Sequence, residues 1–326
     1  MIAELYERSE DWLKYAIQVN LLHTPKNETI ELREAALADV KIQGLLKNIS
    51  DFHGVLVSNH KNPVLPIHSL LFLLDIGFDT DIPEISLAID SILEHKDVNG
   101  VYQSMLNIPK HFGGTGIDSF SWCLCDGPLL LLALLKAGVD YQSHLRSGIE
   151  YLVSLCRDNG FPCAVSPEIG KFRGPGKKSE CCPYATLIMA DLLSYIPEHH
   201  DSSTANASIN SLLNLWENSL EQHPYMFYMG TDFRKLKAPS CWYDIVSVAD
   251  VLSKYHNVHA DPRFIEMINL IKVKQDNEGF FVPESQYVKL NGWDFSQKKA
   301  PSPYLTYLCL RIFERINTAN AVEISS

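Results

Sequence analysis

Four loops gather positive charge in a chain that is otherwise acidic. They carry ten of the 28 lysines and arginines, although the formal net charge is −11. Each loop leads toward a helix N-terminus, where unpaired N–H groups and the helix dipole favour anions. The loops are KHFGGTG (110–116), GKFRGPGKK (170–178), GTDFRKLK (230–237) and FSQKK (295–299). The pattern predicts a site for a phosphate, diphosphate or carboxylate; solvated turns whose lysines balance nearby acids are the alternative.

Eight of these cations are expected to hold the anion. Glycines among them let the backbone approach a ligand closely. Because acidic residues dominate the rest of the chain, a general nucleic-acid binder is excluded and a small anionic molecule is the expected partner. The predicted contacts are Lys171, Arg173, Lys177, Lys178, Arg234, Lys237, Lys298 and Lys299.

Acidic and phenolic side chains near the starts of apolar helices are candidates for proton transfer. Asp126, Tyr184 and Tyr243 occupy matching places in three helices, and Asp244 lies beside Tyr243. A carboxyl group that faces an apolar cavity has a raised pKa and can act as acid or base. The candidate catalytic residues are therefore Asp126, Asp244 and Tyr243. If the aspartates face a neighbouring helix, they are instead partners of the helix dipole.

Aromatic residues at the same helix starts are expected to line a cavity. Trp122, Trp242, Tyr184 and Tyr304 are the predicted substrate contacts. Aromatic faces of this kind stabilise cations, including a carbocation. Packing within a core, with no contact to substrate, is the alternative.

Cysteines recur at the helix starts as well. Alignment of the helix ends places Cys182 over Cys241, and Cys125 lies one residue beyond that pair. Thiolates at helix N-termini have a lowered pKa and suit metal ligation or nucleophilic attack. The three are therefore candidate metal ligands, although their spacing is not that of a zinc knuckle. A buried apolar role and a catalytic thiol stay open.

The helices that must position these groups repeat at a period close to 60 residues. The strongly apolar members cover 63–77, 122–138, 181–196, 241–255 and 301–316, and residues 2–22 are the expected first member. Helices with a narrower apolar stripe alternate with them, at 31–49, 84–95, 146–156, 209–220 and 262–275. In the last of these, Phe264, Met267, Ile268 and Ile271 have the spacing of one buried helix face.

The two helix types predict the architecture. A helix that is apolar nearly all round must be covered on both sides, whereas a striped helix covers one side. We therefore expect an all-α fold, an (α/α)6 toroid of helical hairpins that forms a single domain over residues 1–326. An open solenoid is the alternative, because repeats alone do not settle closure. Residues from about 317 to 326 are expected to form a disordered tail.

The chain carries no segment that predicts membrane insertion or export. The longest apolar run, from Pro128 to Val139 with Lys136 inside it, is too short to span a bilayer. The N-terminus is acidic and lacks an apolar signal core, so the eight cysteines are interpreted as reduced thiols of a cytoplasmic protein. Peripheral membrane contact through apolar surface near the mouth of the cavity stays open.

The repeats resemble those of squalene–hopene cyclases and protein prenyltransferase β subunits. The resemblance covers nearly the whole chain and includes turns such as Gln275-Asp276-Asn277-Glu278-Gly279-Phe280. It implies a barrel of paired helices whose central cavity holds an apolar isoprenoid substrate.

The functional motifs of that family are only partly present. The Asp-x-Asp-Asp acid of the cyclases is represented by Asp79-Thr80-Asp81, which lacks the final aspartate, and no Asp-Asp-x-x-Asp metal site occurs. The resemblance implies that Arg234 and Lys237 bind a diphosphate. Ser240 stands where the family has a zinc-binding aspartate, and Cys241 lies one residue early. Zinc or magnesium as a cofactor is therefore supported by no complete motif.

These features favour an enzyme with an apolar cavity and a basic rim that binds an anionic group. The expected reaction is cyclisation, or the transfer of a prenyl or other group. A non-catalytic scaffold or sensor that binds a peptide or small anion is the alternative. A carbohydrate-active toroid would need paired carboxylates on the cavity face.

Overall fold

The computed structural model describes residues 1–325 apart from 171, 173–177 and 222–232, and side chains as far as Thr318. This part of the chain is mainly helical, as predicted, and has one two-stranded antiparallel sheet. The helices are α1 (Ile2–Glu7), α2 (Asp11–Asn20), α3 (Ile30–Ala38), α4 (Val40–Ile49), α5 (Pro66–Asp75), α6 (Pro83–Leu93), α7 (Gly127–Lys136), α8 (Arg146–Val153), α9 (Pro183–Ser194), α10 (Pro197–His200), α11 (Ser203–Glu217), α12 (Ile245–Leu252), α13 (Pro262–Lys272) and α14 (Pro303–Ser325). The strands are β1 (Ser104–Leu106) and β2 (Ser119–Ser121).

The boundaries of most predicted helices differ from those in the structure, and three cases show why. The expected helix over 2–22 is divided into α1 and α2. The expected helix over 31–49 is divided at Asp39, whose extended backbone and side chain, bonded to the Lys41 N–H, cap α4. The segment over 122–138 becomes helical only at Gly127, because Asp126 caps α7 and Pro128 lies in its first turn.

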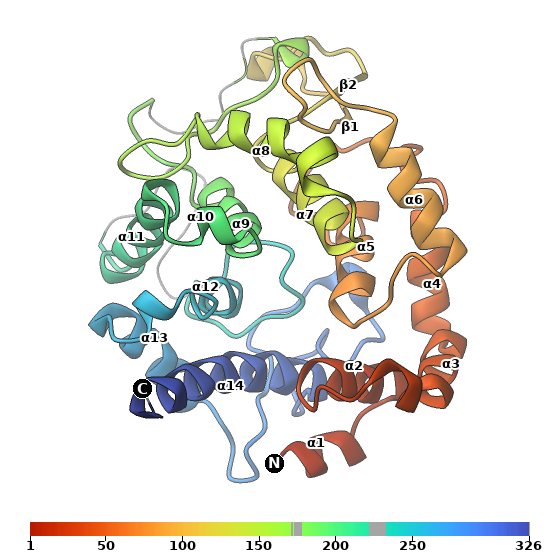
Figure 1. The fold of residues 1–326 in the computed structure, drawn as a ribbon, viewed down its shortest axis with the longest axis vertical. Helices are drawn as coiled ribbons and strands as arrows, with labels where there is room; N and C mark the ends of the chain where they lie inside the picture. Colours follow the sequence, from red (N-terminus) through yellow and green to blue (C-terminus); the bar gives the residue numbers. More distant parts are fainter. Residues whose placement is uncertain (171, 173–177, 222–232, 326) are drawn as a thin grey trace.

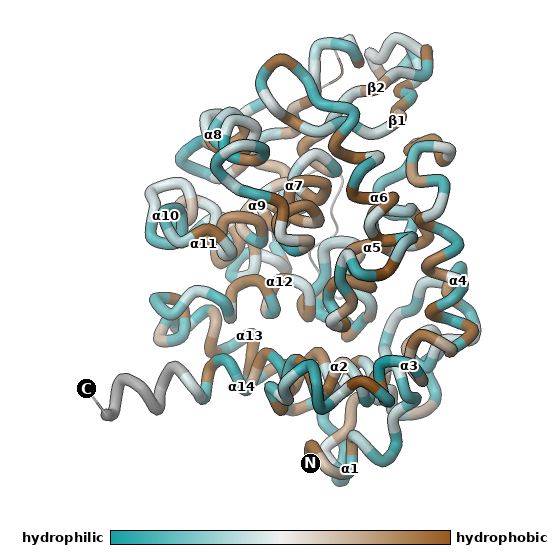
Figure 2. The backbone as a smooth tube through the Cα atoms, turned by 45° about the vertical axis from the view of Figure 1, so that its right-hand side comes forward, coloured by the Kyte–Doolittle hydropathy of each residue, from teal (hydrophilic) through white to brown (hydrophobic). Residues whose placement is uncertain are grey.

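The strongly apolar helices lie inside the molecule. Figure 1 shows α5, α7, α9 and α12 in the middle, with α4, α6, α8, α11 and α13 outside them. In α7 every residue from Gly127 to Leu134 is buried. Figure 2 shows brown, apolar colour along much of α7, whereas α8 and α10 are mostly white or teal. The stripe predicted on α13 is confirmed, since Phe264, Met267, Ile268 and Ile271 are its buried residues.

Consecutive inner helices are neighbours in space. Contacts run from α5 to α7, α7 to α9, α9 to α12, α12 to α14, and from α14 back to α2. The Asn20 side chain at the end of α2 donates to the Asp75 carbonyl of α5 at 3.0 Å and to the Tyr307 hydroxyl of α14 at 2.9 Å. The first inner helix, α2, therefore meets the last inner helix, α14, and Asn20 also connects α2 to α5.

Segments that precede the inner helices contact one another in pairs. Cys123 forms a β-bridge with Val165, so the segments before α7 and α9 meet. Nζ of Lys61 lies 5.1 Å from the centre of the Trp242 ring, so the segments before α5 and α12 meet as well. Within the described residues, no helix combines the length and the apolar character that a membrane crossing requires.

Candidate functional site

A cavity runs along the inner helices, and its lining includes residues from near their N-terminal ends to their C-terminal ends. Its empty volume, counted with its opening, is about 1050 Å³. The walls are mainly leucine, isoleucine and aromatic side chains from α5, α7, α9, α12 and α14 and from the segment before α14. Figure 1 shows the first four of these helices in the middle of the molecule and α14 below them. Representative lining residues are Leu71, Phe72, Leu129, Leu132, Leu187, Ile188, Trp293, Phe295, Tyr304 and Leu308. Such walls suit an apolar molecule.

Aromatic rings form two groups on the cavity wall. Phe72 lies 5.3 Å from Trp293 and 5.3 Å from Tyr304, centre to centre, and Tyr184 lies 4.1 Å from Trp242. Tyr184, Trp242 and Tyr304 thus lie in the lining, where the sequence predicted substrate contacts. Trp122 does not contribute to this lining. Its indole N–H donates to Asp97 at 2.8 Å, and the ring packs against Tyr151.

Ion pairs close the end of the cavity where the inner helices finish, and we call this group the floor network. Lys136 pairs with Asp75, and Lys254 pairs with Asp191. Asp250 accepts hydrogen bonds from Arg311 at 3.1 Å and from Arg315 at 2.8 Å. All six groups other than Arg315 line the cavity, three cationic and three anionic, so the lining is balanced in charge.

The floor network keeps Asp250 and Lys136 ionised in spite of burial. Burial works to raise the pKa of Asp250, but Arg311, Arg315 and Lys254 outweigh it and hold that pKa far below its usual range. Burial likewise works to lower the pKa of Lys136, and the Asp75 carboxylate outweighs it and raises the pKa. Beyond the network lies a second, more open hollow lined by Lys136, Lys254, Arg311, Arg315 and Glu314 among others.

At the other end, which we call the mouth, the lining includes Pro63, Pro239 and Trp242. Two lysines that are not themselves part of the lining, Lys61 and Lys237, lie close to these residues in the chain and face aromatic rings. Nζ of Lys237 lies 3.4 Å from the centre of the Tyr287 ring, and Lys61 lies over Trp242. Burial lowers the pKa of Lys237, while Asp244 and Cys241 act in the opposite direction. Neither ammonium has an ion-pair partner in the part of the chain that the structure describes. The sequence analysis missed Lys61, although it precedes the apolar segment that starts at Pro63.

The other predicted cations lie elsewhere. The Arg234 guanidinium stacks at 4.1 Å on the Trp216 ring and donates to Ser219. Lys178, Lys298 and Lys299 are exposed and do not line the cavity. Lys171, Arg173 and Lys177 lie outside the described residues.

Both candidate catalytic aspartates are buried caps of inner helices. Asp126 Oδ1 accepts from the N–H groups of Cys123 and Gly127 at 2.6 and 2.8 Å. Asp244 accepts from the N–H and hydroxyl of Ser247 at 2.9 and 3.1 Å. Burial raises the pKa of Asp244 to about 6. Tyr243 is buried and stacks on Phe233 at 5.0 Å, and none of these three residues is part of the lining.

The partial cyclase motif and the histidine His68 lie in different parts of the structure. Asp79 and Asp81, which match part of the cyclase motif, lie in the turn between α5 and α6, where they pair with Lys26 and Arg33. His68, by contrast, lines the cavity, and burial lowers its pKa to about 4.

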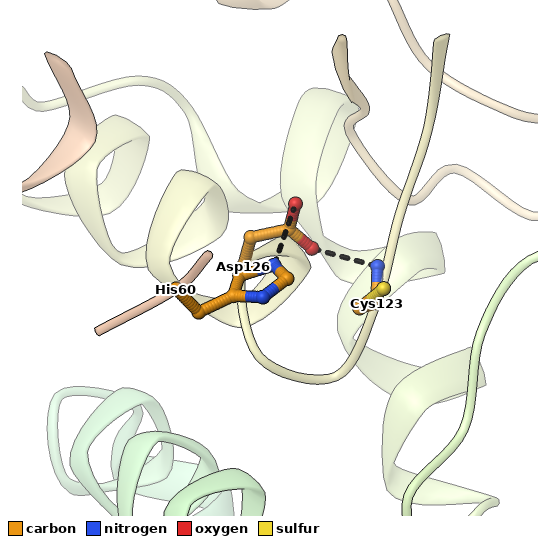
Figure 3. A group of neighbouring side chains, drawn as sticks. All are labelled: His60, Cys123 and Asp126. Carbon is orange, nitrogen blue, oxygen red and sulfur yellow. Dashed lines mark hydrogen bonds and ion pairs between the residues drawn. The ribbon is translucent and has the colours of Figure 1, made fainter. Parts of the chain in front are cut away.

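The three candidate cysteine ligands do not form a common donor cluster in the described structure. The thiols of Cys125 and Cys182 are hydrogen-bonded to each other, and Cys241 is buried in the cavity lining. The Cys125 thiol and the N–H groups of Ala185 and Tyr184 lower the pKa of Cys182. A different set of donors, His60, Cys123 and Asp126, does converge (Figure 3).

Comparison with known proteins gives one structural likeness. No protein-family model matches the chain, and no curated protein matches it. Among solved structures, the apo form of the type II terpene cyclase MstE from Scytonema matches with 12% sequence identity and a TM-score of 0.46. The match covers 95% of this chain and 88% of that one.

Proposed function

We propose that the chain binds an elongated molecule with an apolar body and an anionic end. The body occupies the cavity of an (α/α)6 toroid, and the anionic end lies at the mouth beside Lys237 and Lys61. The single observation behind this assignment is the difference between the two ends of the cavity. Cations of the floor network have carboxylate partners, whereas the two lysines at the mouth have none among the described residues.

An anion at the mouth fits the local chemistry. Lys237 is half-buried, and an ammonium that has lost much of its water gains more from an anionic ligand than an exposed one. Trp242 and Tyr184 stack at the entrance, so an apolar chain passes aromatic faces on its way to the leucine-rich wall. The isoprenoid class of the substrate, and cyclisation or prenyl transfer as its reaction, follow from the resemblance of the repeats and belong to this proposal.

The test uses three probes: farnesyl diphosphate, farnesol and inorganic pyrophosphate. We expect farnesyl diphosphate to bind most tightly, because it alone occupies both the wall and the mouth. Lys237→Met should weaken its binding by about 10- to 100-fold, since hydrogen bonds to charged groups contribute about 1.5–3 kcal/mol. Farnesol binding should change little. Calorimetric titration of the full-length protein measures each affinity.

Two further variants sharpen the result. Lys289→Met is the matched control, because Lys289 is exposed and lies two residues from Tyr287. Leu71→Trp narrows the cavity at a partly exposed wall position and should weaken both farnesyl probes. Equal affinities for farnesyl diphosphate in Lys237→Met and Lys289→Met would show that the anionic end does not bind at the mouth. If neither farnesyl probe binds, the proposal is overturned. Binding without turnover would favour a sensor over an enzyme.

A further inference from the structure

Three donor side chains converge beside the start of α7. One imidazole nitrogen of His60, the Cys123 sulfur and one Asp126 carboxylate oxygen lie within 4.8 Å of one another. Figure 3 shows His60 reaching across from a separate segment to the turn that carries the other two. The proposed function does not use any of these side chains, and none of them lines the cavity.

The turn from Cys123 to Asp126 fixes two of the donors. The Cys123 carbonyl accepts from the N–H groups of Asp126 and Gly127 at 3.0 and 2.9 Å. In return, Asp126 Oδ1 accepts from the N–H groups of Cys123 and Gly127. Because Oδ1 is held in this way, Oδ2 is directed toward His60. The cap of α7 therefore positions a carboxylate oxygen as well as stabilising the helix.

Two of the three donor atoms are buried without a hydrogen-bond partner. These are Oδ2 of Asp126, a residue only 1% exposed, and Nε2 of His60. The two atoms are 3.6 Å apart, which is longer than a normal hydrogen bond. An unsatisfied buried carboxylate oxygen is costly, and a cation between the two atoms would remove that cost.

The separation of 3.6 Å between His60 Nε2 and Asp126 Oδ2 fits metal ligation. With zinc bonds of about 2.0–2.3 Å in tetrahedral geometry, neighbouring donor atoms lie about 3.3–3.7 Å apart. A nucleophilic triad is the competing arrangement, and it places the thiol and the carboxylate at opposite nitrogens of the imidazole. Here one imidazole nitrogen lies within 4.8 Å of both the sulfur and the carboxylate oxygen. The geometry therefore favours a shared cation over a thiol activated by histidine.

We propose that His60, Cys123 and Asp126 bind a divalent metal ion of the zinc class. Magnesium prefers oxygen ligands, whereas a set of nitrogen, sulfur and oxygen donors suits zinc. Three protein ligands leave one tetrahedral position for water or another ligand. The hydrogen bonds to Asp126 Oδ1 act as outer supports that hold the carboxylate in place.

The experiment uses full-length protein treated with a chelator and then titrated with Zn²⁺ or Co²⁺. We expect one tightly bound equivalent by elemental analysis, and a thiolate-to-cobalt charge-transfer absorption. Cys123→Ser, His60→Ala and Asp126→Asn should each weaken Zn²⁺ binding by at least about tenfold, since even outer supports contribute that much. Cys123→Ser should also abolish the charge-transfer absorption.

Controls separate ligand loss from misfolding. Asp126→Asn keeps an oxygen that can accept from Cys123 and Gly127, so the cap of α7 is retained. Cys156→Ser is the matched thiol control, because Cys156 is partly exposed and its thiol donates to the Arg157 carbonyl. Zn²⁺ should raise the melting temperature of the wild type and of Cys156→Ser, but not of Cys123→Ser.

Two results would overturn the metal site. One is a wild-type protein that binds no equivalent of either metal. The other is Zn²⁺ binding in Cys123→Ser that equals binding in Cys156→Ser. Either result leaves the apolar cavity and the lysines at the mouth untouched, because they involve different residues and different probes.

Discussion

Two aspartates of α12, its cap Asp244 and the internal Asp250, have pKa values shifted in opposite directions at the two ends of the cavity. Asp244 caps the start of α12 at the mouth, and Asp250 lies inside the same helix at the floor. Both are at least nine-tenths buried. Burial raises the pKa of Asp244 to about 6, whereas the cations around Asp250 overcome burial and lower its pKa. Within six residues, one carboxyl group has a pKa raised toward neutral pH and the other is held as an anion.

The difference comes from the partners and not from the depth of burial. Asp244 receives two hydrogen bonds from Ser247, which only partly offset desolvation. Asp250 receives hydrogen bonds from two guanidinium groups and lies 3.8 Å from the Lys254 ammonium. The floor thus contains matched charges, while the mouth combines a carboxyl group of raised pKa with two lysines that lack ion-pair partners among the described residues. This contrast makes the mouth the better place for an anionic ligand.

The largest expected effect is at the floor. Asp250→Asn leaves Arg311, Arg315 and Lys254 buried with one fewer anion among them. Removal of one member of a buried ion-pair network costs about 3–5 kcal/mol of unfolding free energy. Urea denaturation at neutral pH measures the loss.

The matched control at the surface is Asp201→Asn. The Asp201 side chain is 88% exposed, so its substitution should change the unfolding free energy by no more than about 0.5 kcal/mol. A loss at Asp250 no larger than the loss at Asp201 would show that the floor network does not hold the inner helices together.

The corresponding substitution at the mouth, Asp244→Asn, should change how the unfolding free energy depends on pH. The folded-state pKa of Asp244, about 6, lies above its ordinary value of 3.8, so the folded state favours the protonated form. That stabilising contribution is complete below the ordinary value and is lost as the pH rises past about 6. The wild type should therefore lose about 2 kcal/mol relative to Asp244→Asn between about pH 4 and about pH 7.5.

Urea denaturation of both proteins at the two pH values measures this difference. Asparagine preserves the cap, because its oxygen accepts from the Ser247 N–H and its amide can donate to the hydroxyl. A constant difference between the two proteins at both pH values would mean that Asp244 ionises as freely in the folded state as in the unfolded chain. The contrast between the two aspartates would then disappear.

Much of the fold could be predicted from the sequence because its helices repeat along the chain and are strongly patterned. The apolar run in α7 and the stripe on α13 dictate which surfaces are buried. The exact helix starts were harder to predict, since caps override periodicity. Asp39 divides one predicted helix, and Asp126 with Pro128 delays another by five residues.

The floor network was missed for a different reason. Each member is one charged residue near the end of an apolar helix, and a single charge there resembles an ordinary helix terminus. The signal lies in the spacing: Asp75 and Lys136 are 61 residues apart, and Asp191 and Lys254 are 63 apart. Asp250 and Arg311 are 61 apart. Partners one repeat apart meet because neighbouring inner helices contact each other, so opposite charges at the repeat period predict ion pairs.

The mouth was only partly predictable because a sequence gives no direction to a side chain. The resemblance to prenyltransferases placed Arg234 and Lys237 together as cations for one diphosphate. In the structure only Lys237 lies beside the entrance, whereas Arg234 turns to Trp216. Asp126 was predicted as a catalytic residue, but its grouping with His60 and Cys123 was not predicted. His60 stands alone in its segment, and only the turn before α7 brings Cys123 and Asp126 to it.

The smallest expected effect concerns Arg234, which belongs to neither end of the cavity. Arg234→Met keeps the apolar stem against Trp216 but removes the guanidinium, whose stacking contributes about 0.5–1 kcal/mol. We expect the unfolding free energy to fall by about that amount, while Lys298→Met, at an exposed position, leaves it unchanged. Arg234→Met should also weaken farnesyl diphosphate binding less than Lys237→Met does, because the Arg234 guanidinium contacts Trp216 and Ser219 instead of the mouth. If both variants weaken farnesyl diphosphate binding equally, Arg234 also contacts the ligand, and its side chain must move away from Trp216 when the ligand binds.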